Sequence, residues 1–135
     1  MASWPTGRLL STAARLVEHA WSEALEARGL THAGLVALHF LDAGPLNQTD
    51  LARRAKVEAQ TMSRTIDRLQ RLGYVERAAD PADRRRMIVT RTDAGAAAWA
   101  STRSLESEVF PAVSDPEGFR ALLREIVEKS SEGRW

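Results

Sequence analysis

The chain has 135 residues, of which 44% are hydrophobic and 27% are charged, and its formal net charge at pH 7 is +1. This length suits a single domain with a core adequate for independent folding if its long helices are paired. Because cysteine is absent, thiol-based redox sensing and a cysteine-ligated zinc site are excluded, and a reducing cytoplasm fits. No run is long and apolar enough for a membrane helix, and the first ten residues lack signal-peptide character, so we expect a cytoplasmic protein.

Two helices are expected before the polar centre of the chain. The first carries an apolar stripe at alternating four- and three-residue spacing, made of Leu10, Ala14, Val17, Trp21 and Ala24. After a break at Arg28-Gly29, Thr31 can cap a second helix that runs to about Asp42. The side chains of this second helix are apolar nearly all round, which predicts that it is buried.

Two short helices joined by a tight turn are expected next. Asn47 can cap the first of them, with Asp50 three residues later in a loose version of the capping box. The turn at residues 56–58 is too short for antiparallel packing, so the two helices must cross steeply, as in a helix-turn-helix. Glu58 is a weak cap, so the second helix can fray or start at Ala59, whereas Gly73 fits the position just past its end.

The second short helix has one apolar face and one polar face. Met62, Ile66 and Leu69 recur at helical spacing and define the buried stripe. The other side and the N-terminal turns carry Gln60, Thr61, Ser63, Arg64, Asp67, Arg68 and Arg71. Gln and Arg can make bidentate hydrogen bonds to adenine and guanine edges in the major groove. For this helix taken alone, a solvated charged face is about as good an interpretation.

A β-hairpin is expected after this helix. Residues 74–79 and 87–92 are short and β-prone enough to form two strands, with Pro81 at a turn position between them. Residues 47–92 contain eleven Lys or Arg against six acids, a local balance of +5 that leaves the other residues at −4. A basic centre with acidic ends suits a protein whose central residues bind a polyanion and whose terminal residues bind a second copy of the same chain.

The tip of this hairpin carries three consecutive arginines. Such residues repel one another unless an anionic partner is present, and a narrow minor groove, with its enhanced negative potential, is such a partner. Asp83 lies close enough in sequence to brace the guanidinium of Arg85, so we predict that Arg85 enters the groove. Arg84 and Arg86 are then expected to reach phosphates. The alternative for the triplet is a solubilising surface loop.

Two further helices are expected after the hairpin. Thr92 can cap an alanine-rich helix that ends at Pro111, and Asp115 with Pro116 can start the last helix. Their apolar residues are Trp99, Leu105, Val109 and Phe110 on the first and Phe119, Leu122, Leu123, Ile126 and Val127 on the second. One subunit could not bury all of these, so we expect a dimer, although in an unrelated protein such stripes are usually intramolecular core.

Five stretches of the chain combine into one recognisable pattern. They are residues 46–52, 62–69, 72–75, 80–86 and 92–95, among which Asp83-x-Arg85, a hydrophobic strand and Thr92-x-x-Gly95 are the more specific marks. This pattern resembles the MarR family of bacterial transcriptional regulators, and the match extends more loosely over about the whole chain. The resemblance implies an obligate homodimer that binds a short palindromic operator. Most members are repressors released by a small, often aromatic or anionic, effector.

The resemblance also implies roles for individual positions. Carried over by position, the residues that resemble major-groove contacts are Gln60, Thr61, Ser63 and Arg64. Arg85 resembles the minor-groove arginine that Asp83 orients. Arg91 departs from the family pattern, which usually has an inward Leu there, so either Arg91 snorkels beside Glu76 or the local strand packing differs.

The sequence therefore predicts a mainly α fold with a small β-hairpin wing, a winged helix-turn-helix with N- and C-terminal dimerisation helices. Residues 1–135 are expected to form a single MarR-like domain, with dimerisation helices at 1–30 and 94–135 and the DNA-binding lobe at 31–92. The predicted function is sequence-specific DNA-binding transcriptional regulation by a homodimeric repressor released by a small-molecule ligand. The alternative is a winged-helix protein-interaction module that pairs with an acidic protein and has little DNA affinity.

Site predictions follow from these roles. The predicted DNA-binding residues are Gln60, Thr61, Ser63, Arg64, Arg68, Asp83, Arg84, Arg85 and Arg86. Trp21 and His39 could line an effector cleft between the dimer helices and the DNA-binding lobe, although a satisfied core or interface residue is the commoner role for both. The histidines show no ligand spacing, and no phosphate loop, HExxH motif or nucleophile elbow is present. We therefore expect no metal, no cofactor and no catalytic site.

Overall fold

The computed structural model of the chain describes the backbone of residues 1–134 and the side chains of residues 1–130. The fold is mainly helical with a small antiparallel sheet, which confirms the predicted class. Within the described residues, every helix is too short or too polar to span a membrane. In chain order the elements are α1 (Thr6–Glu26), α2 (His32–Phe40), η1 (Leu41–Ala43), β1 (Leu46–Asn47), α3 (Gln48–Ala55), α4 (Ala59–Arg71), β2 (Val75–Ala79), β3 (Met87–Arg91), α5 (Asp93–Ser101), η2 (Thr102–Ser104), α6 (Leu105–Val109) and α7 (Pro116–Arg134).

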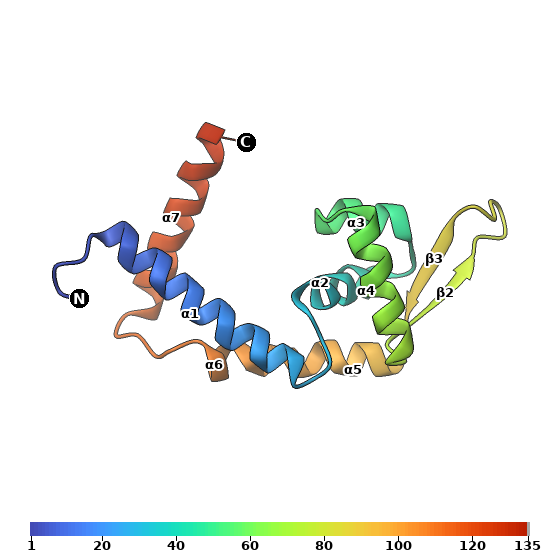
Figure 1. Cartoon of the computed structure of the whole chain (residues 1–135), viewed down its shortest axis with the longest axis horizontal. Coiled ribbons are helices and arrows are strands. Elements are labelled where there is room, and N and C mark those ends of the chain that lie inside the picture. The colour runs from blue at the N-terminus through green and yellow to red at the C-terminus, as the bar shows by residue number, and fades with distance from the viewer. Residues whose placement is uncertain (135) are drawn as a thin grey trace.

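Figure 1 shows a compact lobe at one end of the molecule and an elongated helical part at the other. The lobe contains α2, α3, α4 and the sheet, and α5 leads from it toward α6 and α7. Helix α1 packs against α6, so the N-terminal helix lies beside the segment that leads to α7. The β2–β3 hairpin therefore projects from the end of the molecule that is remote from both termini.

The hydrophobic core of the lobe lies between its three helices and the sheet. The side chains of Leu38, Leu51, Met62, Ile66 and Val89 have no exposed surface and come from α2, α3, α4 and β3. Full burial of one such side chain stabilises a fold by about 1.5–3 kcal/mol. The predicted apolar stripe of α4 is confirmed, because it supplies two of these five residues.

The caps of the two short helices match the sequence prediction. The backbone N of Asp50 donates to Asn47 Oδ1 at 2.7 Å, and Asn47 Nδ2 donates to Asp50 Oδ2 at 2.8 Å. Helix α4 begins at Ala59, and Glu58 before it makes no side-chain capping bond. Beyond the end of α4, Gly73 has a φ of 80°, a conformation that side chains with a Cβ rarely adopt.

The wing contains a third strand that was not predicted. Strands β2 and β3 pair antiparallel with Arg77 opposite Val89, and β1 pairs with the other edge of β3 with Leu46 opposite the same Val89. The resulting strand order is β1-β3-β2. A strand of two residues is too short to show the alternation that identifies strands in a sequence. Strand β1 attaches the wing to the start of α3, which follows it directly.

The alanine-rich helix predicted after the wing is broken into three segments, α5, η2 and α6. Its start is as expected, because the backbone N of Gly95 donates to Thr92 Oγ1 at 3.1 Å. The hydroxyls of Ser101 and Thr102 each donate to the carbonyl three residues earlier, both at 2.6 Å. Such side-chain bonds compete with the α-helical ladder and favour a tighter turn. The prediction of one continuous helix is therefore wrong.

Helix α2 is shorter and less buried than predicted. It ends at Phe40 and continues as the short η1 turn. Thr31 caps it as expected, because its Oγ1 accepts from the backbone N of Gly34 at 3.0 Å. Leu38 is fully buried, whereas His39 is exposed. Within α2, only His32 and His39 are exposed, and the other residues are buried or half-buried.

Large apolar side chains remain exposed on the two terminal helices. Leu16 on α1 is 68% exposed, and Leu122 on α7 is 59% exposed. The predicted stripe of α1 is divided, because Trp21 packs against the core whereas Leu10 is exposed. Contiguous exposed apolar residues on a soluble protein are typical of a contact with another protein.

Candidate nucleic-acid interface

Helix α4 presents its predicted polar face to solvent. Met62 and Ile66 hold the opposite face in the core. The side chains of Gln60, Thr61, Arg64 and Arg68 are exposed, and that of Ser63 is half-buried. The helix has 13 residues, so it carries amide and guanidinium groups along about three and a half turns. A helix with such groups on its free face can enter a major groove, which is about 12 Å wide.

The tip of the wing is held by hydrogen bonds within the turn. The backbone N of Asp80 donates to the Arg86 carbonyl at 2.9 Å, and the backbone N of Ala82 donates to Asp80 Oδ1 at 2.9 Å. A third bond joins the backbone N of Asp83 to the Asp80 carbonyl at 3.2 Å. Asp80 is therefore the residue that closes this turn, as Asp often does through its side chain.

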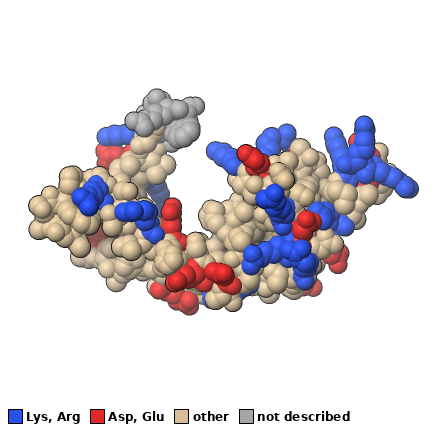
Figure 2. Space-filling view, in the orientation of Figure 1, with Lys and Arg blue, Asp and Glu red and all other residues tan. Residues whose placement is uncertain are grey.

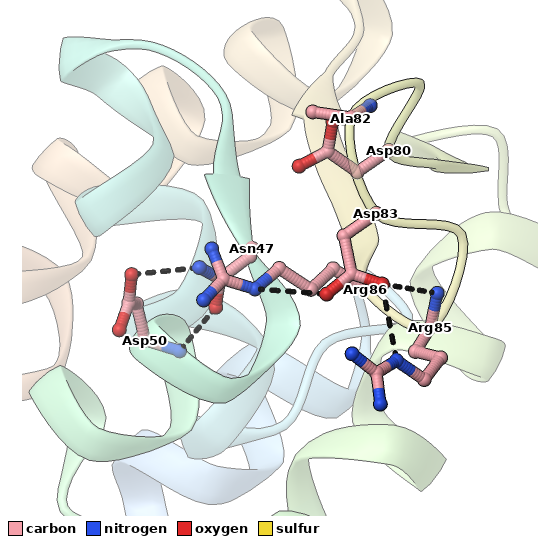
Figure 3. A network of polar contacts seen from close by, with 7 residues as sticks. All are labelled: Asn47, Asp50, Asp80, Ala82, Asp83, Arg85 and Arg86. Carbon is pink, nitrogen blue, oxygen red and sulfur yellow. Dashed lines mark hydrogen bonds and ion pairs between the residues drawn. The ribbon is translucent and has the colours of Figure 1, made fainter.

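The expected contact between Asp83 and Arg85 is present. Asp83 Oδ1 accepts from the backbone N of Arg85 at 3.1 Å and from its Nε at 3.2 Å, while Asp83 Oδ2 lies 3.9 Å from Arg86 Nε. Figure 3 shows the two guanidiniums pointing in different directions from this carboxylate. The side chain of Arg85 is 92% exposed. Its outer nitrogens are thus oriented and accessible to a polyanion.

The same contacts lower the pKa of Asp83 below its ordinary value. The largest cause is the hydrogen bond from the backbone N–H of Arg85, followed by the bond from its side chain. A small desolvation effect opposes them, and the charge of Arg86 adds to them. Because these bonds favour the charged form, Asp83 is a carboxylate at neutral pH. The brace on Arg85 is therefore charge-assisted.

An ionic bracket between α4 and the wing was missed by the sequence analysis. Arg77 on β2 forms an ion pair with Asp67 of α4 through Nη2, and its Nη1 donates to Gln48 Oε1 of α3 at 3.2 Å. These three residues are called the Arg77 bracket below. Helical periodicity places Asp67 on the solvent-facing side of its helix, and no local pattern pairs it with Arg77. The contact depends on strand register, which the sequence did not reveal.

Arg91 pairs with Asp42 and not with Glu76. Its Nη2 lies 2.7 Å from Asp42 Oδ1, and its Nη1 donates to the Leu38 carbonyl at 3.2 Å. Val75 lies directly opposite Arg91 in the β2–β3 pair, so Glu76 projects from the other face. Of the two alternatives for Arg91, snorkelling beside Glu76 is therefore wrong. Instead, Arg91 points inward and joins the base of the wing to the end of α2.

The two residues predicted for an effector lie in different surroundings. Trp21 is half-buried and lines a shallow pocket with Val109 and Phe110. His39 is exposed, and its ring centroid lies 5.8 Å from that of Trp99. Within the part of the chain whose side chains are described, no three His, Asp or Glu residues gather as a metal-binding group.

Basic side chains gather at the wing and on the adjoining part of the lobe. Figure 2 shows Lys and Arg projecting from the wing tip and spread over the neighbouring surface, whereas the terminal helices carry both acidic and basic side chains among uncharged ones. The three tip arginines, Arg84, Arg85 and Arg86, are all exposed. The positive electrostatic potential of these arginines attracts a polyanion toward the wing tip.

Sequence comparison with known proteins matches the region that contains α4 and the wing tip. A sequence model described as the MarR family matches residues 28–86. The uncharacterized HTH-type transcriptional regulator YcgE of Bacillus subtilis (strain 168) is 34% identical over 67 residues, which are 49% of this chain and 44% of YcgE. The match thus spans less than half the length of this relative.

Comparison with solved structures extends the likeness over almost the whole chain. Sco3205, a MarR family transcriptional regulator from Streptomyces coelicolor solved in complex with DNA, is 28% identical with a TM-score of 0.74, covering 96% of this chain and 89% of that one. BpsR of Bordetella bronchiseptica, whose DNA binding is regulated by 6-hydroxynicotinic acid, is 25% identical with a TM-score of 0.74. That likeness covers 97% of this chain and 96% of BpsR.

Proposed function

We propose that the chain is a homodimeric, sequence-specific DNA-binding repressor of the MarR family of transcriptional regulators. The observation that carries the proposal is the outward polar face of α4 beside a wing tip on which Asp83 orients Arg85. Two such elements on one lobe can occupy neighbouring grooves of a duplex. The proposal assigns no catalytic role to any residue, because groove recognition requires none.

In this proposal, α4 lies in the major groove and the wing tip lies in the flanking minor groove. Gln60 and Arg64 form hydrogen bonds to base edges. Arg85 inserts into the minor groove, while Arg84 and Arg86 contact phosphates. The remaining contacts with bases or phosphates are assigned to Thr61, Ser63 and Arg68.

We also propose that residues 1–30 and 94–135 form the dimer interface, with residues 31–92 as the DNA-binding lobe of each subunit. The exposed Leu16 and Leu122 support this division, because a twofold contact would remove both from water. Each subunit then presents one α4, so the half-sites lie one helical turn, about 10 bp, from centre to centre.

The first experiment is selection of bound duplexes from a random library at two salt concentrations, followed by sequencing. We expect an enriched inverted repeat, with affinity that falls by roughly 0.9 logarithmic units per phosphate contact for each tenfold rise in salt. Salt-dependent binding without enrichment would overturn sequence specificity. Failure to bind any duplex, together with capture by an acidic protein, would favour the alternative of a protein-interaction module.

A pair of variants distinguishes the two groove contacts. Arg64→Ala should cost about 1–3 kcal/mol and relax the preference at one base position. Arg85→Ala should weaken binding on all sequences. Arg53→Ala, which removes an exposed cation from α3 that is assigned to no groove contact, is the matched control and should change neither. An equal loss on specific and random DNA for Arg64→Ala would show that this residue touches only phosphate.

Release by a small ligand is part of the proposal. The support is that relatives of the same fold include BpsR, whose DNA binding 6-hydroxynicotinic acid regulates. We assign Trp21 and His39 to the effector site of this chain, and we expect aromatic carboxylates among its effectors. Trp21→Ala should make the repressor unresponsive to such a compound, whereas Trp4→Ala, which changes a tryptophan outside the lining of the Trp21 pocket, should not. Release of both variants at equal effector concentrations would remove Trp21 from the site.

A further inference from the structure

Arg77, like Arg91, lies on the face of the sheet that is turned toward the core. Arg77 on β2 is directly opposite Val89 on β3, and directly opposed residues of neighbouring strands share a face. Val89 is fully buried, so this row of side chains faces the helices of the lobe. The side chain of Arg77 is accordingly only 21% exposed.

The inward-facing guanidinium of Arg77 is paired with polar groups from two helices. Asp67 of α4 receives Nη2 of Arg77 in an ion pair, and Gln48 at the start of α3 receives Nη1 at 3.2 Å. A guanidinium carries five N–H donors in one rigid plane, so one side chain can fix two partners at a set angle. An aliphatic residue could fill the same space without fixing any angle. The arginine therefore contributes geometry in addition to packing.

The three residues of the Arg77 bracket lie on α4, on the wing and at the start of α3. Binding two grooves at once requires that α4 and the wing keep fixed positions relative to each other. Asp67 lies on the helix with the outward polar face, Arg77 lies on a strand of the wing, and Gln48 follows β1 directly. Strand β2 is at the edge of the sheet, with β3 as its only strand neighbour in the described fold. The bracket is thus a direct tie between this edge strand and α4.

We propose that Arg77 is a positioning residue that fixes the orientation of the wing relative to α4, so that both elements meet their grooves at once. This inference rests on the proposed DNA-binding function. A protein whose two contact elements are already held at the right angle loses less free energy to ordering when it binds. Without the bracket, α4 still reaches the major groove but the wing samples several orientations.

The binding test uses Arg77→Met, which keeps the apolar stem and removes the guanidinium. Operator affinity should fall about tenfold. The loss caused by Arg85→Ala should be smaller in the Arg77→Met background than in the wild type, whereas the loss caused by Arg64→Ala should be unchanged. Asp67→Asn should reproduce the effect, and adding it to Arg77→Met should cost nothing further. Arg53→Met, which breaks an exposed ion pair within α3 and is assigned to no DNA contact, is the control.

A second test measures orientation without DNA. The chain has no cysteine, so two can be introduced for spin labels, at the exposed Ala59 on α4 and the exposed Ala82 on the wing tip. Arg77→Met should broaden the distribution of distances between the labels. Arg53→Met, which breaks an exposed Arg–Asp pair within α3, should leave the distribution narrow.

The two tests fail separately. If the wild type binds no duplex, the proposed function fails, and the label distances still decide whether the bracket orients the wing. If Arg77→Met leaves the distance distribution unchanged, or if its affinity loss adds fully to that of Arg85→Ala, the positioning role is overturned. A lower melting temperature with unchanged affinity per folded molecule would also overturn it, because Arg77 would then serve stability alone.

Discussion

Gly95 lies where the start of α5 meets the start of the wing, and its replacement by alanine tests how tightly these two parts are joined. A Cβ at this position would lie 2.0 Å from the Tyr74 carbonyl oxygen and 2.9 Å from its carbon. Non-bonded carbon and oxygen atoms normally stay more than about 3 Å apart, so α5 or the Tyr74 peptide must shift by about 1 Å. The same carbonyl accepts from the backbone N of Thr92 at 3.1 Å, which resists that shift.

The expected cost of Gly95→Ala combines two opposing effects. Overpacking of this kind destabilises by about 1–3 kcal/mol, and the upper end applies because the obstructing atoms are backbone. Alanine is favoured over glycine within a helix by about 1 kcal/mol. The net loss is therefore about 2 kcal/mol, which for a chain of this size lowers the melting temperature by roughly 8 °C.

Thermal unfolding followed by circular dichroism measures this effect. Gly7→Ala is the matched control, because Gly7 is also helical and an added Cβ there meets no atom within 4 Å. Gly7→Ala should raise the free energy of unfolding by up to about 1 kcal/mol. If Gly95→Ala is stabilised to the same degree as Gly7→Ala, the close approach of α5 to the wing does not hold in solution.

Three further predictions concern the cap of α3, the wing carboxylate and the dimer. Asn47→Ala should lower the free energy of unfolding by about 1 kcal/mol in denaturant titration, and no change would mean that the bonds to Asp50 do not stabilise α3. Because its folded-state pKa is lowered, Asp83 stabilises the wing above its unfolded pKa of about 3.9, and this contribution is lost as pH falls through the lower folded value. An NMR titration should therefore place its midpoint below about 3.9, and Arg85→Gln should recover only part of the shift because the backbone N–H remains. Leu122→Glu should shift sedimentation equilibrium toward monomer, and an unchanged dimer would move the interface away from α7.

The features that sequence reasoning predicted correctly depend on residues a few positions apart. Asn47 and Asp50 are three residues apart, as are Thr92 and Gly95, and each pair forms its bond within the first turn of one helix. The conformation of Gly73 is equally local, because it follows from the absence of a Cβ. Such signals define where helices begin and end.

The features that were missed depend on residues far apart in the chain. Arg91 and Asp42 are 49 residues apart, and Arg77 and Gln48 are 29 apart. Their contacts follow from the register of β2 against β3, which decides which side chains of β2 face the core. Hydrophobic periodicity does not reveal that a charged residue faces inward, because it assigns charged residues to the solvent side.

The break between α5 and α6 was missed although its cause is local. The hydroxyls of Ser101, Thr102, Ser104 and Ser107 all donate to carbonyls three residues before them. A cluster of Ser and Thr at this spacing was visible in the sequence. The alanines that precede this cluster are strong helix formers and favour a continuous helix.

The uncapped start of α4 has a consequence for hydrogen exchange. Glu58 provides no side-chain acceptor, so the first amide protons of α4 lack the protection that a cap gives. In the free protein, residues 59–61 should exchange with solvent faster than the middle of the helix. Phosphate oxygens at a helix N-terminus accept the same bonds that a cap would accept. Binding to DNA would then slow exchange at this turn first, so its final ordering would take place on the operator itself.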